Sequence, residues 1–247
     1  MSLSWPSYWL DEIDSTNEEA KRRAWHAGFA PQWIAAHTQS AGRGRLGREW
    51  VSPRGNLYAT ALFKWTGELR EMTRVPFAAA LAVADTVDAL APQAKPKLKW
   101  PNDVRCDRAK VSGILVESGE ANDTRWVAVG IGINVGFVPD GAGQAATSLA
   151  DLRGDRLIDT TVTLEALQEA FAHRLDEVKN GFENTRKAWL TRAEGLGEMM
   201  RATANGAPIE GVFEGMAEDG ALILRLLDGT QSLIRAGDVE LIREVSP

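Results

Sequence analysis

The sequence lacks several features that mark secreted, metal-binding or membrane-spanning proteins. It contains a single cysteine, Cys106, among 247 residues, which excludes an intrachain disulfide. Its three histidines are far apart and cannot supply the usual spacing of zinc ligands with one cysteine. No apolar run approaches the ~18 residues of a membrane span, and the most apolar one, residues 75–84, ends at Asp85. We therefore expect a cytoplasmic protein with no membrane association.

Positive charge is also scarce overall, although it is unevenly distributed. The chain has 28 Lys and Arg against 34 Asp and Glu, a net charge of −6, which argues against a protein that coats nucleic acid. Residues 43–54 nevertheless carry a net charge of +3, and residues 95–110 carry +4. Apolar residues at 44% and charged residues at 25% are typical of an ordinary folded protein with one or two domains. Two basic segments in an acidic chain indicate a local anion site.

Hydrophobic periodicity and turn residues divide the chain into two parts. The expected helices span residues 15–27, 73–90, 164–180 and 182–192, and the expected strands span residues 32–39, 57–64, 97–100, 111–117 and 126–135. The first helix offers two alternative capping boxes, which begin at Ser15 or at Thr16. After Gly197, Asn-Gly and Asp-Gly dipeptides separate short β-prone runs, a pattern that suits a small barrel. We expect a larger domain over residues 1–196 and a small β-barrel over residues 197–247.

A segment rich in glycine and arginine follows the first expected strand. Residues 42–47 form a literal G-x-G-x-x-G, but a dinucleotide site needs a helix directly afterwards, and Pro53 and Gly55 indicate a loop instead. A Walker loop is excluded because Arg48 and Glu49 stand where Lys and Ser or Thr are required. Three arginines spaced by glycines suit bidentate binding of an anion, and their repulsion should leave the loop mobile until an anion binds. On composition alone, a solvated basic turn is the favoured interpretation.

Two further segments place a lysine near groups suited to phosphate chemistry. In residues 97–103 an apolar strand ends in a Pro-fixed turn, where Asp103 is suited to hold Mg²⁺ beside a lysine. Lys110 precedes the expected strand 111–117, in which Gly113 would admit a ligand to the backbone. Taken singly, an ordinary Asn-Asp turn and a surface lysine are the favoured interpretations of these residues.

The expected strand over residues 126–135 has two unlike faces. One face carries only Val and Ile, whereas the other carries Gly130, Gly132 and Asn134. Glycines within a strand often mark a place where a ligand or another part of the chain comes close. The pattern leaves two alternatives of equal weight, a bound ligand or a closely packed helix.

In this order and spacing, the motifs closely resemble those of the biotin–protein ligase family. The matching segments are Ser15-Thr16-Asn17, residues 42–50, residues 99–103, residues 110–117 and residues 130–134. The resemblance implies an α+β fold: a mixed sheet with flanking helices, related to class II aminoacyl-tRNA synthetases, followed by a C-terminal SH3-like barrel. The related lipoate ligases share the fold but have a different glycine-rich motif that this sequence lacks.

The resemblance also implies an enzyme and its substrates. Such a ligase joins biotin and ATP to biotinyl-5′-AMP, with Mg²⁺, and then transfers biotin to a lysine of a biotin carboxyl carrier domain of a carboxylase. A lipoate or octanoate ligase and a non-catalytic adenylate-binding module are the alternatives. Some relatives carry an N-terminal DNA-binding module, but only about 14 residues precede the Ser15 motif, so we expect no DNA binding by that route. Family members occur as monomers or dimers, which leaves a homodimer open.

Carried over by motif position, the resemblance implies a role for each site residue. The catalytic residues would be Arg43, Arg45 and Lys110. The biotin site would comprise Ser15, Thr16, Asn17, Gln39, Gly42, Arg43, Gly44, Arg45, Lys110, Gly113, Leu115, Gly130 and Gly132. The ATP site would comprise Arg45, Arg48, Trp50, Lys99, Asn102, Lys110 and Asn134, and Asp103 would bind the metal. Residues 136–143 show no clear counterpart of the aromatic loop that covers adenine in some relatives, so no residue is assigned to that contact.

Overall fold

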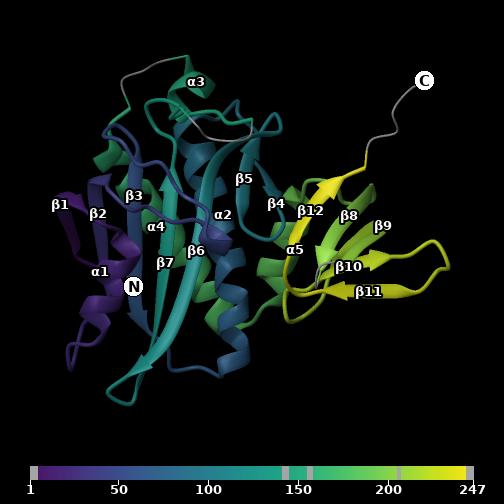
Figure 1. The fold of residues 1–247 in the computed structure, drawn as a ribbon, viewed down its shortest axis with the longest axis horizontal. Coiled ribbons are helices and arrows are strands. Elements are labelled where there is room, and N and C mark those ends of the chain that lie inside the picture. Colours follow the sequence, from purple (N-terminus) through teal and green to yellow (C-terminus); the bar gives the residue numbers. More distant parts are fainter. Residues whose placement is uncertain (1–4, 141–144, 155–157, 205–206, 243–247) are drawn as a thin grey trace.

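The computed structural model describes residues 5–140, 145–154, 158–204 and 207–242, which form two sheets with flanking helices (Figure 1). The larger sheet has seven strands in the order β1-β2-β3-β7-β6-β5-β4. Its strands are β1 (Ser7–Ile13), β2 (Gln32–Gln39), β3 (Leu57–Lys64), β4 (Lys97–Lys99), β5 (Asp103–Cys106), β6 (Ala109–Ala121) and β7 (Thr124–Ile133). Strand β1 runs parallel to β2, and every other neighbouring pair is antiparallel. The sheet is therefore mixed, as expected.

Helices cover both faces of the larger sheet, and the alternation of side chains along β3 shows which face each helix covers. Leu57, Ala59, Ala61 and Phe63 belong to the main core, together with the buried residues of α2 and α4. Leu62 points to the opposite face and packs in a second cluster with α1. The helices are α1 (Thr16–Ala24), α2 (Val75–Leu90), α3 (Leu149–Arg153), α4 (Thr160–Asn180) and α5 (Glu183–Arg192). None of the helices in the described ranges is both long enough and apolar enough to span a membrane.

The second sheet is antiparallel and has the strand order β11-β10-β9-β8-β12. Its strands are β8 (Met199–Ala204), β9 (Ala207–Met216), β10 (Leu222–Arg225), β11 (Gln231–Ile234) and β12 (Asp238–Leu241). In the described residues, β11 and β12 form the two edges, so this sheet does not close into the expected barrel. Gly220 and Gly229 have φ values of 84° and 85°, which the expected Asp-Gly turns require.

The two sheets pack against each other through the turn between β9 and β10. Trp100 Nε1 donates a hydrogen bond to the carbonyl of Gly220 at 3.1 Å. The ring of Phe77 lies so close to Gly220 that any Cβ there would collide with it. Arg186 Nη1 adds a hydrogen bond of 3.1 Å to the carbonyl of Met216. These contacts fix the second sheet beside the end of β4, and thus beside the basic segments predicted from the sequence.

Further details differ from the sequence-based expectations. Strands β1 and β5 were not anticipated, because β1 is an edge strand with mostly exposed side chains and β5 has only four residues. The helix expected from residue 73 begins at Val75, after a 3₁₀ turn over Leu69–Arg74. Both predicted capping boxes are wrong: the side chain of Ser15 caps no backbone N–H. The glutamates of the two predicted boxes, Glu18 and Glu19, instead form ion pairs with lysine and arginine side chains.

Candidate active site

A cavity of about 400 Å³ opens on the face of the larger sheet that α1 covers, and it extends to the start of β12. Its size suits a small-molecule ligand. The cavity brings together nearly all of the residues that the sequence predicted, although they come from five separate segments. The predicted residues that line it are Ser15, Thr16, Asn17, Gln39, Arg43, Gly44, Arg45, Arg48, Trp50, Lys99, Asn102, Asp103, Lys110, Gly113, Leu115, Gly130, Gly132 and Asn134. Gly42 is the exception, because it lies behind the wall against the backbone of Trp50.

One end of the cavity is neutral and lined by hydrogen-bonding groups at the start of α1. The backbone N–H of Thr16 donates to Gln39 Oε1 at 2.8 Å, and the Thr16 hydroxyl donates to the same oxygen at 3.1 Å. Gln39 Nε2 in turn donates to Ser52 Oγ at 2.9 Å. The buried Thr60 hydroxyl lies 2.7 Å from Asn17 Oδ1. Each polar group is therefore held by a neighbour, so this end is rigid before any ligand binds.

Each of the two glycines of β7 leaves room for a different neighbouring side chain. A Cβ at Gly130 would collide with the amide of Asn17, in the first turn of α1. A Cβ at Gly132 would lie 2.5 Å from Trp50 Cε2. Both glycines also line the cavity. The helix interpretation and the ligand interpretation of the glycine face are thus compatible, since the close helix residue is itself part of the cavity wall.

Trp50 lies across the middle of the cavity, against β6 and β7. Its ring lies 5.2 Å from Lys110 Nζ, within the range of a cation–π contact. A Cβ at Gly113 would be 2.9 Å from Trp50 Cζ3, so the glycine is required for this position of the indole. Trp50 Nε1 is buried and has no hydrogen-bond partner. The indole therefore separates the neutral end from a cationic end and carries a free donor.

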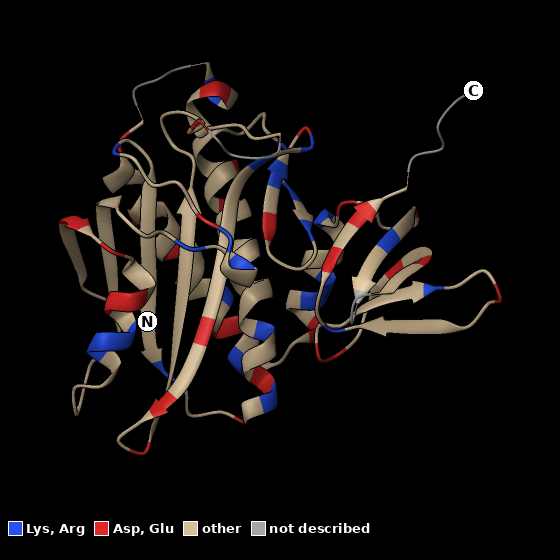
Figure 2. Ribbon diagram, in the orientation of Figure 1, with Lys and Arg blue, Asp and Glu red and all other residues tan. Residues whose placement is uncertain are grey.

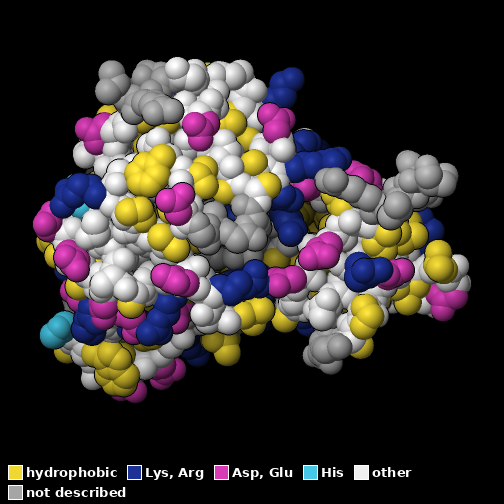
Figure 3. Space-filling model, turned by 45° about the horizontal axis from the view of Figure 1, so that its top comes forward, with side chains coloured by type: hydrophobic (Ala, Val, Ile, Leu, Met, Phe, Trp, Pro, Cys, Tyr) yellow, Lys and Arg dark blue, Asp and Glu magenta, His cyan; other side chains and the backbone are white. Residues whose placement is uncertain are grey.

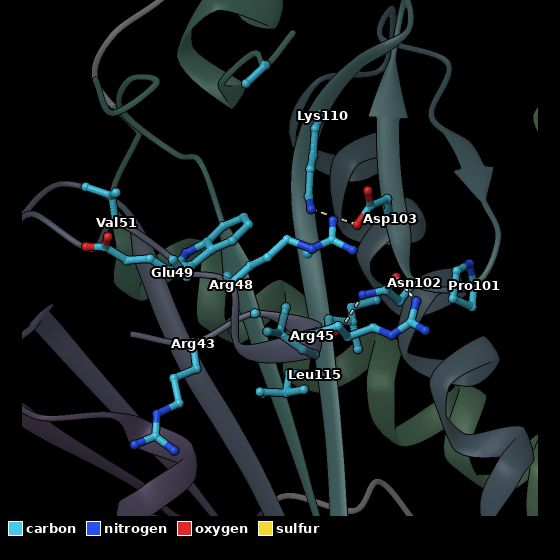
Figure 4. Close-up of a pocket in the computed structure, with 18 of the residues that line it drawn as sticks. Arg43, Arg45, Arg48, Glu49, Val51, Pro101, Asn102, Asp103, Lys110 and Leu115 are labelled. Atoms are coloured by element: carbon cyan, nitrogen blue, oxygen red, sulfur yellow. Dashed lines mark hydrogen bonds and ion pairs between the residues drawn. The ribbon is translucent and has the colours of Figure 1, made fainter. Parts of the chain in front are cut away.

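The cationic end holds the arginines of the loop, but their guanidinium groups do not converge (Figure 4). Arg43 turns away from the cavity and pairs with Glu18 at 3.0 Å. Arg45 donates to Asn102 Oδ1 at 3.0 Å, and Arg48 pairs with Asp238 at 2.5 Å. Each of the three guanidinium groups therefore has a separate partner. The physical reason is mutual repulsion, which the separate partners relieve.

The turn after β4 connects this loop to the sheet. Asn102 accepts from Arg45 and donates through Nδ2 to the carbonyl of Ile114 at 2.7 Å. Lys110 Nζ lies 2.7 Å from Asp103 Oδ1, and both side chains are largely buried. Burial lowers the pKa of the Arg45 guanidinium, but arginine stays protonated in proteins. This part of the cavity thus places two fixed cations, Arg45 and Lys110, near the Asp103 carboxylate.

The distribution of charge follows the same division. Lys and Arg residues lie along the boundary between the two sheets (Figure 2), and their side chains border the hollow in the surface together with acidic ones (Figure 3). Within the part of the chain that the structure describes, no three His, Cys, Asp or Glu side chains cluster as metal ligands. The carboxylates of Glu49, Asp103, Asp238 and Glu240 line the cavity, and that of Asp103 pairs with Lys110. A protein cage for a metal is therefore absent from the described residues, and only a metal that brings other ligands fits here.

Comparison with known proteins identifies the family of this chain. Residues 9–134 match the model of the biotin/lipoate A/B protein ligase family, and residues 195–242 match the biotin protein ligase C terminal domain. A biotin–[acetyl-CoA-carboxylase] ligase of Paracoccus denitrificans is 41% identical over 93% of this chain and 98% of its own length. The chain belongs to the biotin/lipoate A/B protein ligase family.

Other members of the ligase family agree in sequence and in fold. A bifunctional ligase/repressor of Bacillus subtilis is 31% identical over 94% of this chain and 72% of its own length. The biotin protein ligase of Aquifex aeolicus, solved in complex with biotin and ATP, superposes with a TM-score of 0.80. It is 29% identical and the match covers 97% of this chain and 99% of that one. The α+β fold expected from the motifs is therefore confirmed.

Sequence reasoning missed several residues that line the cavity of this ligase-family chain. Trp100 and Pro101 belong to a motif that was recognised, but no role was given to them. Asp238, Val239 and Glu240 come from the second sheet. No signal in the sequence pointed to these three, because they stand about 190 positions after the arginine loop, and only the packing of the two sheets brings them to it.

Proposed function

We propose that this chain is a biotin–protein ligase that converts biotin and ATP to biotinyl-5′-AMP and pyrophosphate, and then transfers biotin to a lysine of a biotin carboxyl carrier domain. The observation that carries the proposal is one cavity that combines uncharged hydrogen-bonding groups at the start of α1 with several Lys and Arg side chains, although Glu49, Asp103, Asp238 and Glu240 also line it. Biotin has a neutral ureido ring at one end and a carboxylate at the other. The names of the relatives from Paracoccus and Aquifex support the same substrates.

In this proposal, the neutral end binds the fused rings of biotin. The polar groups of Ser15, Thr16 and Asn17 face the ureido ring, while Gly130, Gly132 and Leu115 provide a close, apolar wall. Because the Thr16–Gln39 hydrogen bonds already hold these side chains in place, they lose little conformational entropy when biotin binds. The remaining predicted biotin contacts, Gly42, Gly44 and Gly113, would shape the backbone around the tail.

The cationic end suits the first chemical step. The biotin carboxylate attacks the α-phosphorus of ATP, the bond from that phosphorus to the bridging oxygen breaks, and pyrophosphate leaves. Both reactants are anionic, so positive groups held in place lower the barrier most. Arg45 and Lys110 are the best placed, because Arg45 is partly buried, Lys110 is largely buried, and each is fixed by a neighbour. Arg43 must turn inward from Glu18 to contribute, whereas Arg48, paired with Asp238, holds the loop at the edge of the cavity.

The nucleotide would lie between the arginine loop and the turn after β4. Trp50, Lys99, Asn102 and Asn134 face this space, and Arg48 stands at its outer edge. Mg²⁺ would arrive bound to the oxygens of the triphosphate and to water, and the Asp103 carboxylate would supply one protein ligand. Bound there, the ion would neutralise charge on the phosphates. In its absence, Asp103 is held by Lys110.

In the second step, the amine of the carrier lysine attacks the acyl carbon of the mixed anhydride, an amide forms, and AMP leaves. The anhydride must be kept from water until the carrier arrives. The loop over residues 42–54 is suited to this, because it already lies over the cavity and is tied to both sheets. We further infer a cytoplasmic enzyme with a catalytic domain over residues 1–196 and a C-terminal domain over residues 197–247.

A transfer experiment tests the proposal. The protein is incubated with ATP, Mg²⁺, a purified carrier domain and one acid at a time: biotin, lipoate or octanoate. We expect intact-mass spectrometry to show one added biotinyl group on the carrier lysine, and no lipoyl or octanoyl group. Transfer of lipoate or octanoate would make the chain a different ligase of this fold. Adenylate binding without any transfer would make it a non-catalytic module.

A further inference from the structure

The side-chain amide of Asn17 makes nearly all of its possible hydrogen bonds within the protein. The residue is only 5% exposed. Its Nδ2 donates to Glu117 Oε2 at 2.9 Å and to the carbonyl of Leu115 at 3.3 Å. Its Oδ1 lies 2.7 Å from the hydroxyl of Thr60. Both N–H groups are therefore occupied, and only one lone pair of the oxygen is left for a ligand.

The partners of Asn17 leave its amide a single orientation. A carboxylate and a backbone carbonyl are both acceptors, so the nitrogen must face Glu117 and Leu115. The oxygen then lies over Gly130, in the wall of the cavity. A flipped amide would place oxygen against two other oxygens and would offer the ligand a donor in place of an acceptor. The orientation of this amide thus decides what kind of ligand group it can bind.

Glu117 is the stronger of the two groups that hold the nitrogen. Its bond to Asn17 is shorter than that of Leu115, and a carboxylate acceptor makes a stronger hydrogen bond than a neutral carbonyl. Lys21 Nζ holds the other oxygen of Glu117 at 2.6 Å and also pairs with Glu18 at 2.9 Å. Burial opposes the charge on Lys21, but its hydrogen bonds to Glu117 and Glu18 outweigh that effect and raise the pKa of Lys21. Glu117 itself does not line the cavity.

We propose that Glu117 is a positioning residue: it fixes the Asn17 amide with its oxygen toward the cavity, and thereby makes the site select a ring that carries an N–H donor. The inference rests on the proposed function, because it assigns this end of the cavity to the biotin ring. A ureido ring offers N–H donors. The dithiolane ring of lipoate and the chain of octanoate offer none, so they forgo the hydrogen bond that a ureido N–H would make to the second lone pair of Asn17 Oδ1.

The first test measures ligand affinity by calorimetry for the wild type, Glu117→Ala and Glu117→Gln. We expect Glu117→Ala to weaken biotin binding about tenfold, the effect of losing one hydrogen bond to a charged group. Glu117→Gln retains an acceptor oxygen and should lose only about threefold. The affinity for ATP should not change. Glu19→Gln is the matched control, since Glu19 is also a half-buried carboxylate of the same ion-pair surface, with Arg22 and Arg23 as partners, and it should bind biotin normally.

The second test distinguishes positioning from a general structural role. Two cyclic carbamates are used, each a biotin in which oxygen replaces one ureido N–H. One of them should bind the wild type about tenfold more weakly than biotin, and this penalty should largely vanish in Glu117→Ala and shrink in Glu117→Gln. Equal weakening of biotin and both carbamates by these variants, or unchanged biotin affinity in a folded Glu117→Gln, would overturn the inference. A wild type that binds no biotin would instead overturn the proposed function.

Discussion

Arg48 Nη2 lies 2.5 Å from Asp238 Oδ2, and this ion pair joins the arginine loop to the first residue of β12. Both side chains are at least half exposed, so the pair contributes only about 0–1 kcal/mol to stability. Its importance lies in position, because it ties the loop to the second sheet at the edge of the cavity. Arg45 reinforces the tie through a longer hydrogen bond of 3.5 Å to the carbonyl of Gly237.

The first prediction concerns this tie. Asp238→Asn should raise the KM for ATP about two- to fivefold, because the loop then has to be ordered over the nucleotide without the ion pair. Glu210→Gln is the control, since Glu210 makes a comparably exposed pair with Arg201 in the same sheet, outside the cavity. Steady-state adenylation kinetics measure both. An unchanged KM in Asp238→Asn, or the same rise in Glu210→Gln, would show that the tie is unimportant for ATP binding.

The second prediction concerns Lys110. Lys110→Ala should slow formation of the adenylate by about 10²–10³, the usual effect of removing one fixed charge from a transition state, and it also leaves Asp103 without its partner. Single-turnover adenylation measures the rate. Lys187→Ala, an exposed lysine of α5, should react like the wild type. If the rate in Lys110→Ala falls by less than a few-fold, Lys110 does not contribute to catalysis.

The third prediction concerns Arg45, which connects the loop to Asn102. Arg45→Gly should loosen the loop, so that biotinyl-5′-AMP escapes and modifies exposed lysines of other proteins. The measurements are the dissociation rate of the adenylate and the biotinylation of a bystander protein. Arg70→Ala serves as a control at an exposed arginine outside the cavity. Normal adenylate retention with unchanged carrier selectivity in Arg45→Gly would refute the assignment.

The fourth prediction concerns Gly130, a residue of β7 that lines the cavity. Gly130→Ala should weaken biotin binding about 10- to 100-fold, because the new methyl group collides with Asn17 and overpacking costs about 1–3 kcal/mol. Gly215→Ala is the control: a Cβ at this glycine of β9 has nothing within 4 Å, so its binding should be unchanged. Calorimetry with biotin measures both. If Gly130→Ala binds biotin as tightly as the wild type, the ring does not lie near this strand.

The sequence predicted those parts of the site that are local in the chain. Strands over residues 32–39 and 57–64 have the predicted bounds, because long apolar runs between turn residues define them. The motifs around Arg45, Asn102 and Lys110 were found because each is contiguous. Their meeting in one cavity was expected from the resemblance, and the sheet order β3-β7-β6-β5 produces it.

The parts that the sequence did not predict depend on packing between distant segments. The Asp238 contact arises only where the second sheet meets the first, and the hydrogen bond from Asn17 to Glu117 spans 100 positions. The wrong expectation for the capping box has a partly local cause, since Glu18 pairs with Lys21, three residues on, as well as with the more distant Arg43. The separate partners of Arg43, Arg45 and Arg48 were likewise not predicted, because each lies far away in the sequence.

The most direct test of the central claim is the exchange of labelled pyrophosphate into ATP, measured with each candidate acid in turn. It reports the first chemical step alone and needs no carrier protein. If the chain adenylates biotin, we expect exchange that depends on biotin and is lost in Lys110→Ala. Lipoate and octanoate should give no exchange above background. Exchange that depends on lipoate or octanoate, or no exchange with biotin in a protein that binds it, would contradict the account.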